Sequence, residues 1–160
     1  MTIIEQTMAF KGVFPQIICM MSLLWEFCES GSLPEVRAAL ARGEDVNSKD
    51  EDGETGLMWA VSDGYDSIVE LLLEQPTLDL NCTDNLGDTA LHYAAEFHNV
   101  EAVRMLLADP RLNTANQKND DDLTPVMHAM DEANTNVLRE LVGHPSVDLS
   151  EELVGRWTFL

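Results

Sequence analysis

The fold is decided by the stretch Gly87-Asp88-Thr89-Ala90-Leu91-His92-Tyr93-Ala94-Ala95, which precedes the apolar run Val103-Arg104-Met105-Leu106-Leu107. The order of residue types predicts a turn, a short helix and a second, more aliphatic helix. The same order begins upstream at Gly53 and returns in weaker form downstream at Asp122. A repeating unit therefore describes the chain better than any single motif.

The period of the repeat follows from the Ser or Thr residue that begins each first helix. Ser22, Thr55, Thr89 and Thr124 follow one another at intervals of 33, 34 and 35 residues. A hydroxyl at a helix start can accept a hydrogen bond from a free backbone amide. Helices this short are marginal alone, so we expect each unit to bury its apolar face against the next. Small residues let neighbouring first helices approach closely: Ala60, Ala94, Ala95 and Ala129.

The segments between the helix pairs are polar and keep a second constant spacing. Asn47, Asn81 and Asn116 each lie eight residues before the next Thr. The variation in repeat length therefore falls before these asparagines, around Pro76 and Pro110, where loops accept insertions.

With these motifs, the chain resembles the ankyrin-repeat family from about Ser22 to Ser150. The third unit matches the family signature best, through Asp84, Gly87, Thr89, Leu91, His92, Ala94 and Ala95. In the second unit Gly56 and Met58 stand where the family has Pro and His. In the fourth unit Asp122 replaces the turn Gly, which predicts a strained or rearranged turn.

The resemblance implies an all-α ankyrin-repeat solenoid of helix-turn-helix units joined by β-turn or hairpin loops. We expect repeats at about 21–50, 51–83, 84–118 and 119–150. The first unit lacks the turn and carries Trp25, Glu26 and Phe27 in its first helix, which suits a capping unit.

The two ends of the chain fall outside the repeat. From the sequence, residues 1–20 are expected to be either an extra terminal element that packs on the first repeat or a poorly ordered extension. Residues 151–160 are expected to form a C-terminal capping tail with a short helix or turn, in which Trp157 and Phe159 cover the last repeat. Ser150 begins only an incomplete capping box, because Leu153 stands where the box requires Glu or Gln.

The charge balance limits the classes of partner. The chain has 29 acidic and 9 basic residues, a formal net charge of −20 and an isoelectric point near 4.2. That charge would repel nucleic acid and anionic membranes and would favour a protein with a basic surface. The alternative is that acidity only maintains solubility.

The cysteines and the hydropathy indicate a cytoplasmic or nuclear protein. Cys19, Cys28 and Cys82 are odd in number and widely spaced, which favours a reducing compartment over a disulfide framework. No run approaches the roughly 18 apolar residues of a membrane span. A secretory signal peptide is not expected, because Glu5 precedes Lys11 and the start is not basic.

Catalytic and metal-binding sites are not expected. No nucleophile lies in a recognisable pattern with a base, so the chain is interpreted as non-enzymatic, with no cofactor. A Cys82/His92 zinc pair lacks a ligand spacing typical of zinc sites. The carboxylates at Asp50 and Asp120 do not place Gly and Glu as a calcium loop requires. In the family, the position of His92 hydrogen-bonds backbone between repeats.

A surface is the better candidate for function. The turn tips and the exposed side of the first helices commonly form the concave binding face of ankyrin proteins. Three rings occupy the same position in successive repeats: Trp59, Tyr93 and His128. Carboxylates surround them, as in a protein interface with a charged rim. The predicted partner-binding residues are Glu51, Asp52, Trp59, Asp63, Tyr93, Glu96, Phe97, Asp120, Asp121, His128, Asp131 and Glu132. Trp59 and Tyr93 could instead pack between repeats, whereas the register of Phe97 points it away from the stack.

The sequence therefore predicts a non-catalytic module that binds a partner protein through an acidic concave face, and a monomer is favoured. The alternative is an architectural or self-associating module that uses the apolar residues of segment 1–20.

Overall fold

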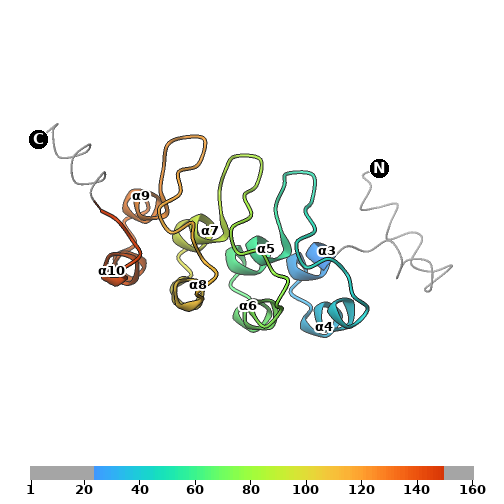
Figure 1. Ribbon diagram of the computed structural model, residues 1–160. Coiled ribbons are helices and arrows are strands. Elements are labelled where there is room, and N and C mark those ends of the chain that lie inside the picture. Colours follow the sequence, from blue (N-terminus) through green and yellow to red (C-terminus); the bar gives the residue numbers. More distant parts are fainter. Residues whose placement is uncertain (1–23, 150–160) are drawn as a thin grey trace, which may run out of the picture.

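The structure is a computed structural model that describes residues 24–149 of the 160-residue chain. The described residues form helices in four consecutive pairs (Figure 1). The pairs are α3 (Leu24–Glu29) with α4 (Leu33–Ala41), α5 (Gly56–Ser62) with α6 (Asp66–Leu73), α7 (Ala90–Glu96) with α8 (Val100–Ala108), and α9 (Pro125–Asp131) with α10 (Thr135–Gly143). Each predicted unit contains one pair, although the unit boundaries themselves stay a prediction.

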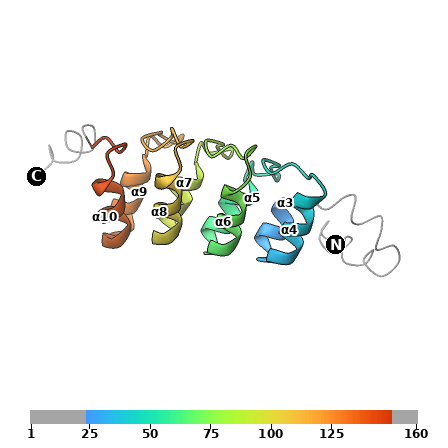
Figure 2. The ribbon, with the colours of Figure 1, turned by 60° about the horizontal axis from the view of Figure 1, so that its bottom comes forward.

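The helices form two rows, and the long turns that join one helix pair to the next project beyond these rows (Figures 1 and 2). The first helices, α3, α5, α7 and α9, pack on one another in sequence, and so do the second helices, α4, α6, α8 and α10. Between residues 24 and 149 the only β-type pairings are two isolated bridges, each at the base of a long turn: Lys49 with Thr55, and Thr83 with Thr89. The expected all-α solenoid is confirmed.

The first helices begin where the threonines predict. The hydroxyl oxygen of Thr55 accepts a hydrogen bond from the amide of Met58 at 3.4 Å, and Thr124 accepts one from Met127 at 3.3 Å. In the third unit the amide of Thr89 donates to Nδ1 of His92, as the amide of Thr55 donates to the sulfur of Met58 in the second unit. Each cap satisfies an amide that the first helical turn leaves without a partner.

Small residues set the spacing between first helices, as expected. Ala60, Ala94 and Ala129 occupy equivalent positions and are fully buried. At the start of α5, a Cβ on Gly56 would lie 2.8 Å from the sulfur of Cys28 in the first unit. The Gly that replaces the family's Pro therefore fits a close contact with its neighbour. Burial raises the pKa of the Cys28 thiol to about 12, so this thiol is a core group.

Asn47, Asn81 and Asn116 form an asparagine ladder along the solenoid. Each side-chain amide donates to a backbone carbonyl of the following unit: Thr77, Arg111 and Ser146 respectively, at 2.7–3.0 Å. Each side-chain oxygen accepts an amide two residues further on: Asp79, Asn113 and Asp148, at 2.6–2.8 Å. The constant spacing in the sequence thus marks a bidentate clamp between neighbouring units.

The turns use left-handed backbone at equivalent positions. Asp122 has a φ of 61°, where the equivalent turn residues Gly53 and Gly87 have φ of 80° and 82°. The fourth unit therefore keeps the turn and holds an Asp in a conformation that favours Gly. Between the helices of each pair, His98 and Ala133 likewise have positive φ.

Several predictions lie outside the described residues. These are the roles of residues 1–20 and of the tail 151–160, the helix start at Ser22, and the state of Cys19.

Candidate protein-interaction surface

Each long turn is closed by one side chain, which we call the turn-closing residue: Asp50, Asp84 or Asn119. Its Oδ1 accepts hydrogen bonds from the amides two and four residues later, at 2.8–3.1 Å. These bonds hold the turn in a fixed shape, as short polar side chains commonly do. The turn tips therefore present their exposed groups from a rigid frame.

The predicted row of rings lies against these residues. Trp59, Tyr93 and His128 form the ring row, and each follows its turn-closing residue by nine positions. Nε1 of Trp59 donates to Oδ2 of Asp50 at 2.8 Å, and the Tyr93 hydroxyl donates to Oδ2 of Asp84 at 2.9 Å. All three rings are half-buried, so each braces its own turn and keeps one part exposed.

Tyr93 also connects two units. Its hydroxyl has one proton, which is shared between the carboxylates of Glu54, in the preceding unit, and Asp84. Burial, together with these two carboxylates, raises the pKa of Tyr93, so the phenol stays protonated. The pKa of Glu54 is raised mainly by its own burial, against the opposing effect of the Tyr93 hydrogen bond. The interaction between repeats that the sequence left open for Tyr93 is present in the structure.

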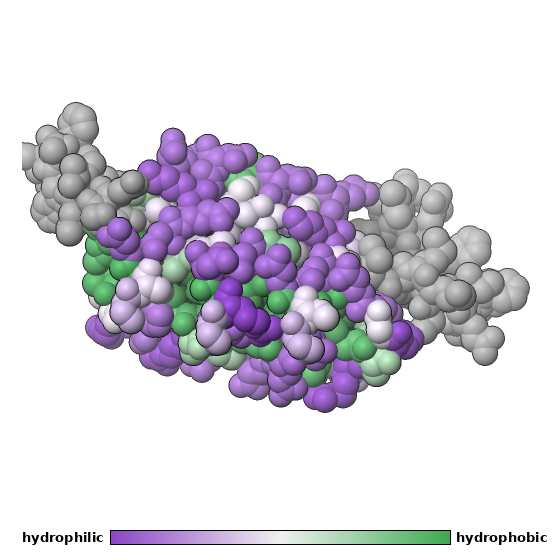
Figure 3. All heavy atoms as spheres, viewed as in Figure 1, coloured by the Kyte–Doolittle hydropathy of each residue, from purple (hydrophilic) through white to green (hydrophobic). Residues whose placement is uncertain are grey.

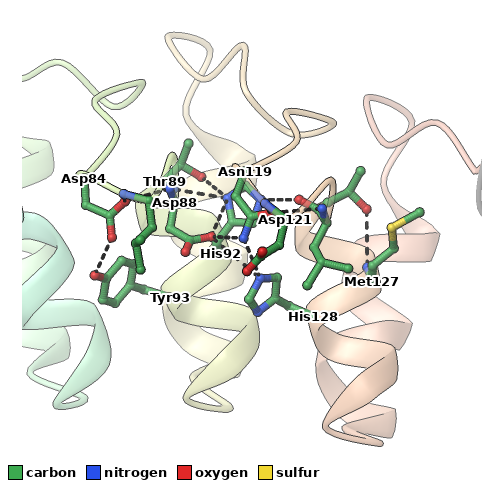
Figure 4. A network of polar contacts seen from close by, with 12 residues as sticks. Asp84, Asp88, Thr89, His92, Tyr93, Asn119, Asp121, Met127 and His128 are labelled. Atoms are coloured by element: carbon green, nitrogen blue, oxygen red, sulfur yellow. Dashed lines mark hydrogen bonds and ion pairs between the residues drawn. The ribbon is translucent and has the colours of Figure 1, made fainter.

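The fourth unit repeats this arrangement with different chemistry (Figure 4). The amide nitrogen of Asn119 donates to Oδ1 of Asp88 at 2.9 Å and lies 3.2 Å from Nε2 of His128. An amide nitrogen can only donate, so Nε2 of His128 accepts. Asp88 of the third unit stands 3.6 Å from the same nitrogen.

His92 is structural, as its position in the family implies. It is fully buried, and its Nε2 donates to the carbonyl of Leu123 in the next unit at 3.1 Å. Nδ1 accepts from the amide of Thr89, so the ring is neutral with its proton on Nε2. Burial lowers the pKa of His92, since the charged form would lose its hydration.

The other predicted residues are exposed. Side chains at the turn tips and at the ends of the first helices face solvent: Glu51, Asp52, Asp63, Glu96, Phe97, Asp120, Asp121, Asp131 and Glu132. Phe97 keeps 50% of its surface exposed and stacks on Tyr93, with ring centroids 6.0 Å apart and planes 17° apart. Leu86, at a turn tip, is 66% exposed. That these residues contact a partner stays a prediction.

Basic side chains are distributed unevenly between the two rows of helices, whereas acidic side chains occur in both rows. The first helices contain no Lys or Arg. Within residues 24–149, every arginine lies in a second helix or in the loop that follows one: Arg37, Arg42, Arg104, Arg111 and Arg139. We call the turn tips and the exposed side of the first helices the first-helix face.

Several of these arginines bind carboxylates on their own side of the molecule. Arg104 pairs with Glu140 at 2.8 Å, and Arg111 pairs with Asp109 at 2.7 Å. These pairs neutralise part of the second-helix side. The two lysines of the described residues, Lys49 and Lys118, lie in the long turns beside the exposed carboxylates of the turn tips. In Figure 3 hydrophilic residues cover the turns at the top of the view, and hydrophobic residues form a broken band at the level of the helices.

The described residues offer little for small-molecule or metal chemistry. A shallow depression of about 270 Å³ lies between α8 and α10, lined by Arg104, Leu107, Arg139 and His144 among others, away from the first-helix face. Across residues 24–149 no three His, Cys, Asp or Glu side chains are grouped to hold a metal ion. None of the helices in that range is long and apolar enough to span a bilayer.

Sequence reasoning missed the turn-closing residues and the ladder as structural devices. It considered Asp50 only as a calcium ligand and used the asparagines only as spacing marks. The constant interval of nine residues from Asp50 to Trp59 and from Asp84 to Tyr93 is the signal that could have found the pairs.

Comparison with known proteins agrees with this architecture. The family model for ankyrin repeats matches residues 23–116 with three copies, which is more than half of the chain. The fourth helix pair lies beyond the matched residues. Ankyrin repeats generally mediate protein–protein interaction and are generally non-catalytic.

Three relatives illustrate the range of proteins that carry similar repeats. The human photoreceptor ankyrin repeat protein is 38% identical over 92 residues, 56% of this chain and 20% of its own length. Inversin-B of Xenopus laevis is 42% identical over 67 residues, 41% of this chain and 7% of its own length. Putative glutaminase 2 of Caenorhabditis elegans is 30% identical over 83 residues, 52% of this chain and 14% of its own length. The chain thus spans a fifth or less of these relatives, and it belongs to the ankyrin-repeat family.

Proposed function

We propose that the chain binds a partner protein with a basic surface through its acidic first-helix face. The observation that carries this proposal is the uneven distribution of basic residues: the first helices contain no Lys or Arg, whereas the arginines of residues 24–149 lie in and after the second helices. Exposed carboxylates at the turn tips and first-helix ends therefore have no arginine beside them in the same row of helices. A charged face of one sign steers a complementary partner and suppresses association with partners of the same sign.

Phe97 is the proposed apolar anchor of this surface. It is half exposed, rests on Tyr93 and follows Glu96 directly. Equivalent positions in the adjacent units hold acidic residues, Asp63 and Glu132. An aromatic side chain inside a charged rim is the usual composition of an energetic centre in a protein interface. The fitting partner segment presents an apolar side chain between Lys or Arg residues.

The Phe97→Ala variant tests the anchor. Because the ring is half exposed and outside the core, its removal should cost little stability, while partner affinity should fall by tenfold or more, about 1.4 kcal/mol. Partner binding is measured by calorimetry and stability by thermal unfolding. The buried variant Leu91→Ala is the control, because it should lose several kcal/mol of stability. A melting temperature that falls as far for Phe97→Ala as for Leu91→Ala would place Phe97 in the core.

Charge is tested with two matched pairs of substitutions. The first pair, Glu96→Gln with Glu132→Gln, removes two negative charges from the first-helix face. The second pair, Glu70→Gln with Glu74→Gln, removes two negative charges from exposed residues in and directly after α6. Only the first pair should slow association with the partner. Salt should also slow association of the native chain, because attraction between exposed charges is screened beyond about 10 Å at 0.1 M salt. Equal effects of both pairs, or rates that do not change with salt, would remove charge steering from the proposal.

The partner itself is found by capture from a cell extract with the native chain and with a variant combining Asp120→Asn, Asp121→Asn and Phe97→Ala. A protein that binds the native chain and loses affinity for the variant supports the proposed surface. A partner that both chains retain equally shows that binding uses another face.

A further inference from the structure

Equivalent exposed residues of the second, third and fourth units form two lines along the solenoid. The turn-tip line, two positions after the turn-closing residues, consists of Asp52, Leu86 and Asp121. The helix-end line, at the residue directly after α5, α7 and α9, consists of Asp63, Phe97 and Glu132. Leu86 is 66% exposed and Phe97 is 50% exposed. The four acidic residues are also exposed, so each line has an apolar residue in the third unit between two carboxylates.

Contacts between neighbouring units fix the spacing of these lines. The amide of Asn85 donates to the carbonyl of Asp52, and the amide of Asp120 donates to the carbonyl of Leu86, both at 2.9 Å. These bonds join the third turn tip to the tips on both sides. The first helices pack directly on one another, which sets neighbouring units about 8–10 Å apart. The carboxylates therefore lie at a defined interval on both sides of the apolar centre.

An α-helix matches this interval better than an extended chain does. A helix brings a side chain back to nearly the same face every seven residues, about 10.5 Å along its axis. An extended chain covers about 10 Å in three residues, which turns the side chain to the opposite face. Adjacent side chains of a helix also differ in direction by about 100°, so two central residues can face one line each.

We infer that the partner segment is an α-helix that runs along the solenoid, an inference that rests on the proposed function and specifies its partner. Apolar side chains at the centre of this helix contact Leu86 and Phe97. Lys or Arg residues about seven positions before and after the centre meet the carboxylates of the second and fourth units. Tyr93 supports the apolar centre, because its ring stacks on that of Phe97.

Two synthetic peptides of identical composition test the spacing. Both consist of Ala and Gln with two adjacent leucines at the centre and four lysines. In the matched peptide a Lys stands seven residues before and after each Leu. In the shifted peptide the interval is five residues, which places the lysines about 140° around the helix from the leucines.

The matched peptide should bind the full chain about tenfold or more tightly than the shifted peptide in calorimetry. Its helical circular dichroism signal should increase on binding, because a short free peptide is only partly helical in water. Equal affinities of the two peptides, no binding of the matched peptide, or binding without a gain of helix would overturn the inference.

The variants Leu86→Asp and Phe97→Glu separate apolar contact from charge. Each gives the third unit a side chain that a neighbouring unit has at the same position, so the fold should tolerate it, as thermal unfolding checks. The added negative charge would strengthen a purely electrostatic attraction, whereas loss of the apolar centre should weaken binding of the matched peptide by about fivefold or more. Val142→Asp is the control, because Val142 is 50% exposed on α10, in the other row of helices. Higher affinity of Leu86→Asp or Phe97→Glu, or an equal loss in Val142→Asp, would overturn the inference.

Failure of this inference is distinguishable from failure of the proposed function. If the two peptides bind equally while the partner captured from extract loses affinity for Phe97→Ala, the surface binds a segment of another shape and the helix is wrong. If the captured partner is insensitive both to Phe97→Ala and to the Glu96→Gln, Glu132→Gln pair, the proposed function fails and the inference fails with it.

Discussion

Replacing Asn81 with Ala should remove the central rung of the asparagine ladder. The side chain donates to the carbonyl of Arg111 at 3.0 Å and accepts from the amide of Asn113 at 2.8 Å. It also accepts from the hydroxyl of Thr114 at 3.2 Å. The substitution leaves these backbone groups of the next unit without their partner.

The magnitude follows from the number and burial of these bonds. Each intramolecular hydrogen bond contributes a net 0.5–1.5 kcal/mol, roughly. The partly buried carbonyl of Arg111 would regain only some hydration, whereas the exposed amide of Asn113 could bind water. We expect a loss of about 2 kcal/mol of unfolding free energy. For a chain of this size that loss corresponds to a decrease of about 4–8 °C in melting temperature.

Urea unfolding followed by circular dichroism and tryptophan fluorescence measures the loss. Coincident transitions by both probes are required, since long repeat arrays can unfold in steps. Asn136→Ala is the matched control, because Asn136 is exposed on α10 and Ala favours a helix. A cost for Asn81→Ala no greater than that of Asn136→Ala would show that the clamp adds nothing to the joining of neighbouring units.

Two further predictions concern single side chains. His92→Met should cost about 1 kcal/mol near pH 7.5, because it removes the bond to Leu123 while Met fits this position in two other units. The lowered pKa of His92 means that its stability is present above about pH 6.5, the value for an unfolded chain, and is lost as pH falls toward the folded value. The difference between the two proteins in urea titrations should therefore shrink toward pH 5. Asp122→Gly should raise stability by about 0.5 kcal/mol by relieving a positive φ, measured by thermal unfolding.

Specific outcomes for His92→Met and Asp122→Gly would contradict these two predictions. A stability difference for His92→Met that stays constant from pH 7.5 to pH 5 would contradict the assignment of a neutral buried ring. Asp121→Gly is the control for Asp122→Gly, because Asp121 is equally exposed and lacks the positive φ. Equal stabilisation by both would point to the loss of negative charge instead of relief of the backbone.

Features that repeat along the chain were predictable from sequence. Thr55, Thr89 and Thr124 mark helix starts because a capping hydroxyl acts on its own helix, and Ala94 marks a close packing position for the same local reason. The two partners of Tyr93 were not predictable, because one of them, Glu54, lies 39 residues away and meets the phenol only after the neighbouring turn has its shape. Exposure of Phe97 could be expected from helix register, but its stacking on Tyr93 depends on the side-chain conformations of both rings, which the sequence does not determine.

The pairing of turn-closing residues with the ring row has a consequence for how such a surface can diversify. Asp50 and Asp84 accept hydrogen bonds from Trp59 and Tyr93, whereas Asn119 donates toward His128, so the direction of the bond reverses when both members change together. A ring that donates a hydrogen bond can therefore be replaced by one that accepts, without loss of the turn, if the residue nine positions earlier changes from Asp to Asn. The exposed ring of each repeat can then differ in its hydrogen-bonding character when its turn-closing residue changes with it, while the helices and turns keep their arrangement.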